Sequence, residues 1–211
     1  YMENCLGALK VLIDHIDDSY VSVTDEWKRQ TGGAPVNLKR TMVSCISVDS
    51  PIYNSVIEYA GMLNDQCKDI ALQLALVCSC EVTTRVKTQN SIEFKIQNYK
   101  TEAHEFGKVQ INRCINDLFG VRIFLKPPMD FDDIFSFIRE TYGDKYRILD
   151  SSKQDYRAIH LYFKKDNYSF PWELQIWNEC DSESNLISHK KYKQEYTAWE
   201  KKNKKGGTLD D

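Results

Sequence analysis

The chain of 211 residues has a formal net charge of −3 and a hydrophobic fraction of 42%. This length and composition predict one large globular domain, with or without an appendage, and argue against a polybasic nucleic-acid binder. No apolar run approaches the roughly 20 residues of a membrane-spanning helix. The seven cysteines are scattered and odd in number, which is typical of reduced thiols. We therefore expect a cytoplasmic protein with no membrane segment and no DNA partner.

Two helices are predicted in the N-terminal segment. Apolar residues at helical spacing predict the first over residues 2–20. A second, short helix is predicted over 24–31, where a Gly-Gly pair ends it. Residues 33–49 are expected to form a loop with a short strand at 41–48.

A long helix is predicted to begin at Pro51, which follows a capping serine. Its apolar stripe alternates spacings of four and three residues and comprises Val56, Ala60, Leu63, Cys67, Ile70, Leu74 and Val77. A strand at 82–87 and a helix over 91–99 are predicted to follow, with Asn90 or Ser91 as the helix cap.

The second half of the chain alternates strands and helices. Apolar or alternating runs predict strands at 121–125, 146–149, 156–163 and 171–177. Helices are predicted from Asp130 to about Gly143 and over 187–200, before a lysine-rich tail. This order indicates an α+β protein with a single mixed β-sheet flanked by helices.

The stretch from the strand at 82–87 into the following helix carries three cations, Arg85, Lys87 and Lys95, with the hydroxyl of Ser91 between them. A helix start binds anions through its free N–H groups and its positive dipole end, and cations beside it strengthen the site. The stretch therefore predicts a phosphate site built from side chains, because no glycine-rich phosphate loop is present. The alternative is a strand edge followed by a solvated helix start.

Two acids are candidate magnesium ligands. Asp117 lies just before a glycine and a strand, and Glu173 lies inside an apolar strand, on the same side as Gln175 and Trp177. A carboxylate in such a strand is unfavourable without a partner, and Mg²⁺ needs only one or two carboxylates when phosphates complete its shell. The alternatives are a turn cap for Asp117 and an edge-strand surface position for Glu173.

Further residues of the candidate site come from the neighbouring predicted strands. Arg122 and Arg157 are candidate phosphate donors, although Arg122 is also consistent with a buried ion pair to one of the acids. Tyr156 is a candidate for stacking on a base, or simply a strand-edge aromatic. His160 is predicted to be a satisfied core histidine. A polar helical face with His189, Tyr192 and Lys193 is expected to be surface unless it closes over the site.

Taken in order, these residues resemble the RelA/SpoT synthetase domain of small alarmone synthetases. The motifs that carry the resemblance are Arg85-Val-Lys87-x-x-x-Ser91-Ile-x-x-Lys95, Asp117-x-x-Gly120-Val-Arg122-Ile, Tyr156-Arg157-Ala-Ile-His160, Glu173-Leu-Gln175-Ile and His189-x-x-Tyr192-Lys193. They cover about residues 56–195. The resemblance implies a five-stranded mixed sheet related to nucleotidyltransferases. It also implies transfer of the β,γ-pyrophosphate of ATP to a ribose 3′-hydroxyl.

The resemblance also implies roles for single residues. The ATP phosphates would be held by Arg85, Lys87, Ser91 and Lys95, with Arg122 near ATP or the acceptor phosphates. Asp117 would bind magnesium, and Glu173 would bind it or activate the hydroxyl. The acceptor side would comprise Tyr156 stacked on the base, with Arg157, His160, Gln175 and Lys193.

Departures from the family pattern lie on the acceptor side. Asp155 replaces a glycine, Ala158 replaces a serine, and Trp177-Asn178 stands where the family commonly has Arg-Thr. Members with such departures resemble toxic small alarmone synthetases of toxin–antitoxin pairs, which implies the 3′ end of tRNA as acceptor and an antitoxin as partner. Two basic clusters are candidate contacts to the tRNA backbone, or else solvated surface: Lys28, Arg29, Lys39 and Arg40, and the lysines between 190 and 205.

The sequence therefore predicts an ATP- and magnesium-dependent pyrophosphokinase, with tRNA slightly favoured as the acceptor over GDP or GTP. A catalytically inactive nucleotide- or RNA-binding module is the third hypothesis, which the two acids disfavour. The expected organisation is a helical extension over 1–50, a synthetase domain over 51–195 and a basic tail over 196–211.

Overall fold

A computed structural model describes residues 2–77, 80–126 and 128–188. Its centre is one mixed sheet whose strands lie in the order β1-β2-β5-β4-β3. These strands are β1 (Glu81–Val86), β2 (Phe119–Leu125), β3 (Arg147–Asp150), β4 (Ile159–Phe163) and β5 (Trp172–Asn178). Strands β2 and β5 pair in parallel, and the other neighbours pair antiparallel. The predicted fold class, a single mixed sheet flanked by helices, is confirmed.

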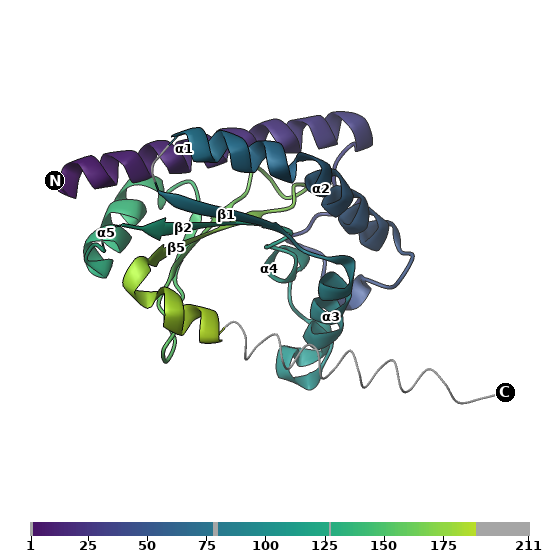
Figure 1. Ribbon diagram of the computed structural model, residues 1–211. Coiled ribbons are helices and arrows are strands. Elements are labelled where there is room, and N and C mark those ends of the chain that lie inside the picture. Colours follow the sequence, from purple (N-terminus) through teal and green to yellow (C-terminus); the bar gives the residue numbers. More distant parts are fainter. Residues whose placement is uncertain (1, 78–79, 127, 189–211) are drawn as a thin grey trace.

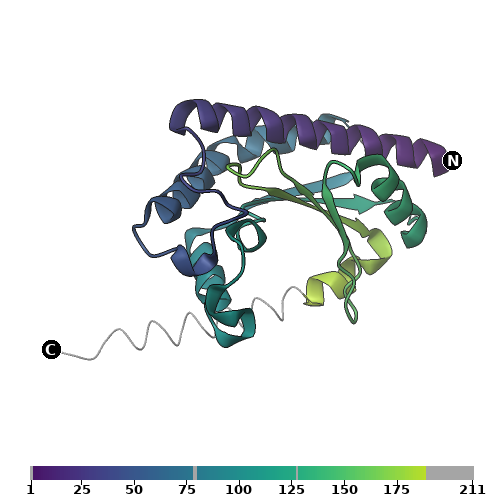
Figure 2. The same cartoon turned by 180° about the vertical axis from the view of Figure 1, so that it is seen from behind.

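Two long helices, α1 (Met2–Thr31) and α2 (Pro51–Val77), lie over the same face of the sheet (Figures 1 and 2). The remaining helices are α3 (Gln89–Tyr99), α4 (Ile111–Cys114) and α5 (Phe131–Tyr142). Short 3₁₀ turns lie at Val43–Cys45, Glu102–Gly107 and Glu179–Asp181. Residues 182–188 are helical as well.

The sheet has an apolar face and a polar face because its strands alternate. In β5, Trp172, Leu174 and Ile176 are buried, whereas the intervening Glu173 and Gln175 are only partly buried. The apolar face packs on the two long helices through aromatic contacts: Trp172 meets Tyr20 of α1, with ring centroids 5.5 Å apart, and its indole N–H donates to Tyr59 Oη of α2 at 2.9 Å. The polar face therefore presents the candidate site residues.

The N-terminal prediction of two helices is wrong, because α1 runs unbroken through the expected break. Tyr20, Val23 and Trp27 are buried and continue the apolar stripe across it. The short strand predicted at 41–48 is also wrong. That segment holds the turn Val43–Cys45 and a single bridge from Met42 to Gln110, with no neighbouring strand.

Two boundaries differ from the prediction for local reasons. Helix α3 begins two residues early because Thr88, not Asn90 or Ser91, is its N-cap and accepts from the Ser91 N–H. Strand β4 begins at Ile159 and not at residue 156. The Asn185 amide satisfies the N–H and C=O of Arg157 at 2.8 and 2.9 Å, which takes these groups out of the ladder. Of the helix predicted over 187–200, all but its first two residues lie outside the described residues.

Asp17 ties α1 to the start of β3. It is buried, its carboxylate accepts from Tyr146 Oη, and it pairs with Lys145 Nζ at 2.5 Å. We expect Asp17→Ala to lower the free energy of unfolding by about 1–3 kcal/mol, because the buried tyrosine hydroxyl loses its acceptor. Urea denaturation tests this, with the exposed neighbour Asp18→Ala as the matched control. Equal stability of the two variants would contradict the assignment.

Candidate active site

The strand register brings the predicted site residues together on the polar face. Gly120 of β2 lies beside Glu173 of β5, and Arg122 lies beside Gln175. On the other side of β5, Tyr162 of β4 is level with Glu173 and His160 is level with Gln175. Arg85 of β1 is level with Gly120, so the glycine separates the arginine from the glutamate. The predicted site residues of β1, β2, β5 and β4 thus lie at neighbouring positions across the polar face of the sheet.

Asp117 binds two lysines at the end of β1 and along α3. Its Oδ2 lies 2.7 Å from Lys87 Nζ, and its Oδ1 lies 2.9 Å from Lys95 Nζ. Lys95 Nζ also donates to Asn116 Oδ1 at 3.1 Å. These three charged side chains are 12–21% exposed, so the cluster is largely shielded from solvent. Two of the predicted phosphate-binding cations, Lys87 and Lys95, are therefore already paired with a carboxylate, Asp117.

The charge states of this cluster follow from its contacts. Burial alone would raise the pKa of Asp117, but Lys95 and Lys87 outweigh it and hold that pKa below its ordinary value. Burial opposes the charge of Lys95, yet Asp117 raises the pKa of that lysine. Burial lowers the pKa of Lys87, with Asp117 acting in the opposite direction. At neutral pH, Asp117 and Lys95 are both charged.

Ser91 lies in the first turn of α3, midway in the sequence between Lys87 and Lys95. Its hydroxyl accepts from Thr88 Oγ1 at 2.9 Å, and its N–H points to the same oxygen at 3.4 Å. The turn carries no acid, so the positive end of the helix dipole is not neutralised there. This arrangement suits a phosphate group.

Glu173 is held by three neighbours on the polar face. Its Oε1 accepts from Tyr162 Oη at 3.0 Å and lies 3.1 Å from His160 Nδ1, and its Oε2 accepts from Gln175 Nε2 at 2.8 Å. Burial would raise the pKa of Glu173, but the contact with His160 lowers it below the ordinary value. The carboxylate is therefore ionised at neutral pH and fixed in orientation.

His160 connects Glu173 to Tyr156. The Nε2 atom of His160 lies 2.9 Å from Tyr156 Oη, while its Nδ1 faces Glu173. Burial raises the pKa of Tyr156 to about 12, so its hydroxyl stays protonated. The prediction of a core histidine is therefore only partly right: His160 is satisfied, but by site residues.

Arg122 is fixed by two contacts that hold the plane of its guanidinium. Its Nε and Nη2 donate to Gln175 Oε1 at 3.0 and 2.9 Å, and its Cζ lies 3.7 Å from the centroid of the Trp177 ring. Trp177 is buried on this face in a small apolar cluster with Phe124 and Ala158, against which Tyr156 packs. One indole therefore contacts Arg122 and, edge-on at 5.9 Å, Tyr156.

The structure excludes the simpler alternatives for three residues. Asp117 binds lysines and caps no helix of the described chain. Glu173 lies on β5, the central strand, and not on an edge. Arg122 donates to Gln175, and neither acid is its ion-pair partner among the described residues.

Not every predicted residue joins the constellation. Arg157 is exposed and its Cζ lies 4.7 Å above the ring of Phe131 in α5, away from the His160 and Glu173 contacts. Arg85 is exposed at the edge strand β1 and acts electrostatically on Arg122 and Lys87. The predicted residues His189, Tyr192 and Lys193, and the basic tail, lie outside the described residues.

Three contributors were missed as site residues. Tyr162 donates to Glu173, Asn116 accepts from Lys95, and Trp177 stacks on Arg122. The alternation of β4 was a usable signal for Tyr162, which lies two residues from His160 and so on the same face. For Trp177, there were two signals: the alternation that puts it on the same side as Glu173 and Gln175, and its replacement of a family arginine.

A metal site must be tested against these donors. Among the described residues, no group of three metal-ligating side chains lies together. Both oxygens of Asp117 and both of Glu173 already accept a hydrogen bond or ion pair. A divalent cation would thus share these two carboxylates with bound phosphates and would displace at least one of their present partners.

In the described part of the chain, no helix is long and apolar enough to cross a membrane.

Comparisons with known proteins give a family match and a set of similar solved structures. Residues 84–197, more than half of the chain, match the family model described as the region found in RelA/SpoT proteins. No curated protein matches the chain. Solved structures similar to it include small alarmone synthetase 1 from Bacillus subtilis, with 22% identity, a TM-score of 0.38 and coverage of 67% of this chain and 77% of that chain. Small alarmone synthetase 2 from Bacillus subtilis shows 19% identity, a TM-score of 0.37 and coverage of 67% and 78%.

The family match includes the second half of β1, all of β2, β4 and β5, and both carboxylates, so it covers the strands that build the polar face. The predicted resemblance is thereby confirmed, and the chain belongs to the RelA/SpoT family.

Proposed function

We propose that the chain is a pyrophosphokinase that moves the β,γ-pyrophosphate of ATP to a ribose 3′-hydroxyl. The observation that carries the proposal is the pair Asp117 and Glu173, both ionised, at the same end of neighbouring strands and within electrostatic reach of each other. Cations flank them on the β1 and α3 side, and base-stacking candidates flank them on the β4 side. The phosphates of ATP and the base of the acceptor thus have adjacent binding places on either side of the two acids.

The ATP phosphates belong on the side of Lys87, Lys95 and Ser91. Phosphate oxygens arriving there compete with Asp117 for the lysines, which already point toward one acid. The positive dipole end of α3 adds to the attraction for phosphate, because its first turn carries no acid. Arg85 and Arg122, on adjacent strands of the same face, would contact the rest of the nucleotide. Such positioning supplies most of the catalysis in phosphoryl-type transfers.

The acceptor hydroxyl belongs beside Glu173. The ionised carboxylate accepts the hydroxyl proton as the oxygen attacks the β-phosphorus, and AMP leaves with the displaced electron pair. Tyr162, His160 and Gln175 hold the carboxylate in one orientation, so little reorganisation is needed. The acceptor base would stack on Tyr156, whose hydroxyl is tied to His160.

A magnesium ion fits the donor set by type. It takes oxygen ligands and often needs only one or two carboxylates, with substrate phosphates completing its shell. Asp117 and Glu173 would hold it, and the bound ion would neutralise charge on the transferred group.

The acceptor we favour is the 3′ end of tRNA, with GDP or GTP as the alternative. Trp177 fills a position on the acceptor side where the family commonly carries a cation, which supports a departure from guanosine nucleotides. In the N-terminal basic cluster, Lys28 forms an ion pair with Asp166. Lys39 lies close enough to Lys164, which follows β4, to lower the pKa of that lysine, so it remains a candidate contact for the tRNA backbone. An antitoxin partner and a toxin role would follow from the tRNA acceptor.

Incubation with γ-labelled ATP and magnesium, with GDP, GTP or deacylated tRNA offered separately, tests this proposal. Label in tRNA alone supports the favoured acceptor. Label in a guanosine tetra- or pentaphosphate supports the alternative and removes the argument for a toxin. Absence of label in all three would contradict the proposed activity.

Trp177→Leu is expected to raise the KM for ATP by about tenfold, since a desolvated cation–π contact contributes on the order of 2 kcal/mol. Without the indole, the Arg122 guanidinium keeps its hydrogen bonds to Gln175 but loses the ring that packs against its plane. Trp177→Phe should retain most of the affinity because a ring remains. Trp172→Phe is the matched control, a buried tryptophan of the same strand on the opposite face. If the control raised the KM as much, the effect would be general destabilisation.

A further inference from the structure

A buried asparagine outside the sheet holds the segment that carries Tyr156. Asn185 lies on the helix at residues 182–188 and is 0% exposed. Its Oδ1 accepts from the Arg157 N–H at 2.8 Å, and its Nδ2 donates to the Arg157 C=O at 2.9 Å. Figures 1 and 2 show this helix beside the loop that joins β3 and β4. One side-chain amide thus connects two segments that are 28 positions apart in the chain.

The backbone around Tyr156 explains why Arg157 needs such a partner. Tyr156 and Lys153 exchange hydrogen bonds at 2.8 and 3.0 Å, and the Ser151 N–H donates to the Ala158 C=O at 2.9 Å. In an antiparallel pair, the residue between two hydrogen-bonded positions directs its own N–H and C=O outward. Arg157 lies between Tyr156 and Ala158, so the loop itself offers no partner to its two backbone groups. The amide from the helix supplies both partners.

Fixing the backbone of Arg157 also fixes the neighbouring Tyr156. Adjacent residues of an extended segment point to opposite sides. The Arg157 side chain packs on Phe131 of α5, and the Tyr156 ring lies on the polar face of the sheet. There the Tyr156 hydroxyl lies 2.9 Å from His160 Nε2, and the ring contacts Trp177 edge-on. These side-chain contacts orient the ring, while the backbone contact sets the position from which the side chain extends.

The helix that carries Asn185 is itself anchored to the strand that carries Glu173. It follows β5 through the 3₁₀ turn Glu179–Asp181, and the Ser182 hydroxyl donates to the last C=O of that strand at 3.3 Å. Asn185 therefore connects the residue assigned to the acceptor base, Tyr156, to the strand whose glutamate is assigned to the acceptor hydroxyl.

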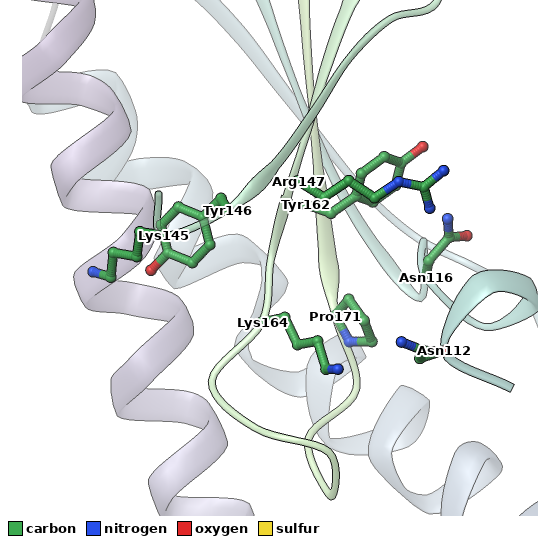
Figure 3. A pocket seen from close by; sticks show the side chains of 8 residues that line it. All are labelled: Asn112, Asn116, Lys145, Tyr146, Arg147, Tyr162, Lys164 and Pro171. Atoms are coloured by element: carbon green, nitrogen blue, oxygen red, sulfur yellow. The ribbon is translucent and has the colours of Figure 1, made fainter. Parts of the chain in front are cut away.

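Asn185 is not placed to touch a substrate. Its side chain is buried, and both polar groups of its amide bind Arg157. It also does not line the cavity of about 150 Å³ at the ends of β3 and β4, whose walls include Arg147, Tyr162 and Lys164 (Figure 3). An effect of Asn185 on the acceptor must therefore pass through the segment that it holds.

We propose that Asn185 is a positioning residue for the acceptor, because it holds Tyr156 where a stacked base brings its ribose hydroxyl to Glu173. The inference rests on the proposed function, which assigns Tyr156 to the acceptor base and Glu173 to the hydroxyl. Without the amide, the loop between β3 and β4 can move relative to β5, and the stacked base moves with it. This movement weakens binding of the acceptor and leaves the ATP side, which is built on β1 and α3, unchanged.

The chain contains a second amide of the same kind, which provides a matched control. Asn178 is 8% exposed, its Oδ1 accepts from the Met129 N–H at 3.1 Å, and its Nδ2 donates to the Met129 C=O at 2.9 Å. Met129 lies just before α5, in a segment to which no site residue is assigned. Asn185→Ala and Asn178→Ala therefore each remove one buried amide and its two hydrogen bonds to a distant backbone.

Both variants are assayed with ATP, magnesium and whichever of GDP, GTP and deacylated tRNA the wild-type protein accepts. We expect Asn185→Ala to raise the KM for the acceptor about tenfold, which is within the range that stacking on an aromatic ring contributes. Its kcat and its KM for ATP should stay close to those of Asn178→Ala. Equal KM values for the acceptor in the two variants would overturn the proposal.

A less disruptive variant covers the case in which Asn185→Ala does not fold. Asn185→Asp keeps the size of the side chain and an acceptor for the Arg157 N–H, but it places a carboxylate oxygen against the Arg157 C=O in place of the donor. The same selective rise in the KM for the acceptor is expected of it, and a KM equal to that of Asn178→Ala would again overturn the proposal.

Combining Asn185→Ala with Tyr156→Ala shows whether Asn185 acts through Tyr156. Tyr156→Ala alone should raise the KM for the acceptor at least as much as Asn185→Ala does. The second substitution should then add little, because the ring that Asn185 positions is already gone. Effects that multiply in the double variant would show that Asn185 acts independently of Tyr156, which is contrary to the proposal.

Failure of this inference is distinguishable from failure of the proposed function. Hydrogen exchange of the Arg157 amide needs no activity, and it should be faster in Asn185→Ala than in the wild type and unchanged in Asn178→Ala. If the wild type transfers no label, the proposed function fails, and equilibrium binding of GDP, GTP and deacylated tRNA to the two variants replaces the kinetic comparison. Weaker binding to Asn185→Ala supports the positioning role, whereas equal binding or unchanged exchange excludes it.

Discussion

Glu173→Gln is expected to lower kcat by a factor of about 10² to 10⁴, the usual contribution of a positioned general base. The amide keeps the size of the side chain and can still accept from Tyr162 or Gln175, but it cannot take the proton of the attacking hydroxyl. The KM for ATP should change less than kcat, because the lysines assigned to its phosphates bind Asp117 and stay in place, although one of the two proposed magnesium ligands is lost. Steady-state kinetics with saturating acceptor measures this.

Glu179→Gln is the matched control for that experiment. Glu179 follows β5 directly, is about half exposed, pairs with Lys126 at 2.8 Å and makes none of the contacts of Glu173. It should leave kcat unchanged, and thermal unfolding of both variants excludes a folding defect. A Glu173→Gln protein that retains full transfer would show that another group accepts the proton.

Asp117→Asn is expected to reduce both stability and activity. Removing one partner of a buried ion pair leaves its cations uncompensated, a loss of about 3 kcal/mol in the free energy of unfolding. Lys87 and Lys95 are 12% and 15% exposed, so solvent compensates them only in part. Urea denaturation at neutral pH measures the loss, and a variant as stable as the wild type would contradict the assigned ion pairs.

Adding Lys95→Met separates the structural role of Asp117 from its functional one. The double variant removes a second charge from the cluster, so it should recover part of the stability lost in Asp117→Asn. It should remain inactive, because both a phosphate-binding cation and a magnesium ligand are missing. Recovered activity in the double variant would show that Asp117 serves only to neutralise Lys95.

The pH dependence of stability provides a second measure of the same cluster. The folded-state pKa of Asp117 lies below its unfolded value of about 3.9. Its contribution to stability is therefore fully present above that unfolded pKa and is lost as pH falls through the folded pKa. Asp117→Asn should lack this acid-dependent part, and urea denaturation should show that it loses less stability than the wild type as the pH falls below about 4.

The sequence predicted the β1, β2 and β5 side of the site best, because strand alternation and a helix start are local properties. Lys87, Lys95 and Asp117 are adjacent to one strand or one helix turn, and the structure joins them directly. The contact between Glu173 and Gln175 was predicted equally well, since the alternation of β5 puts both side chains on one face of the strand.

Features that depend on packing between distant segments could not be predicted. The long α1 helix packs on Trp172 and Tyr59, which are distant in the sequence. The local signal for its second half, the apolar stripe that Tyr20, Val23 and Trp27 continue, shows its meaning only once these partners are known. Arg157 was placed by sequence next to Tyr156, yet Asn185, 28 positions further on, fixes its backbone and α5 receives its side chain. The cavity at Arg147 and Lys164 joins β3, β4 and the 110–116 segment, so it exists only in the folded chain.

The position of label in the products tests the central claim most directly. ATP labelled separately at the α-, β- or γ-phosphorus is incubated with the wild-type protein, magnesium and the accepted substrate. Transfer of pyrophosphate predicts that β- and γ-label both appear in the acceptor in equal amounts, while α-label appears in AMP. Appearance of γ-label in the acceptor with β-label left in ADP would show transfer of a single phosphate, and it would contradict the account.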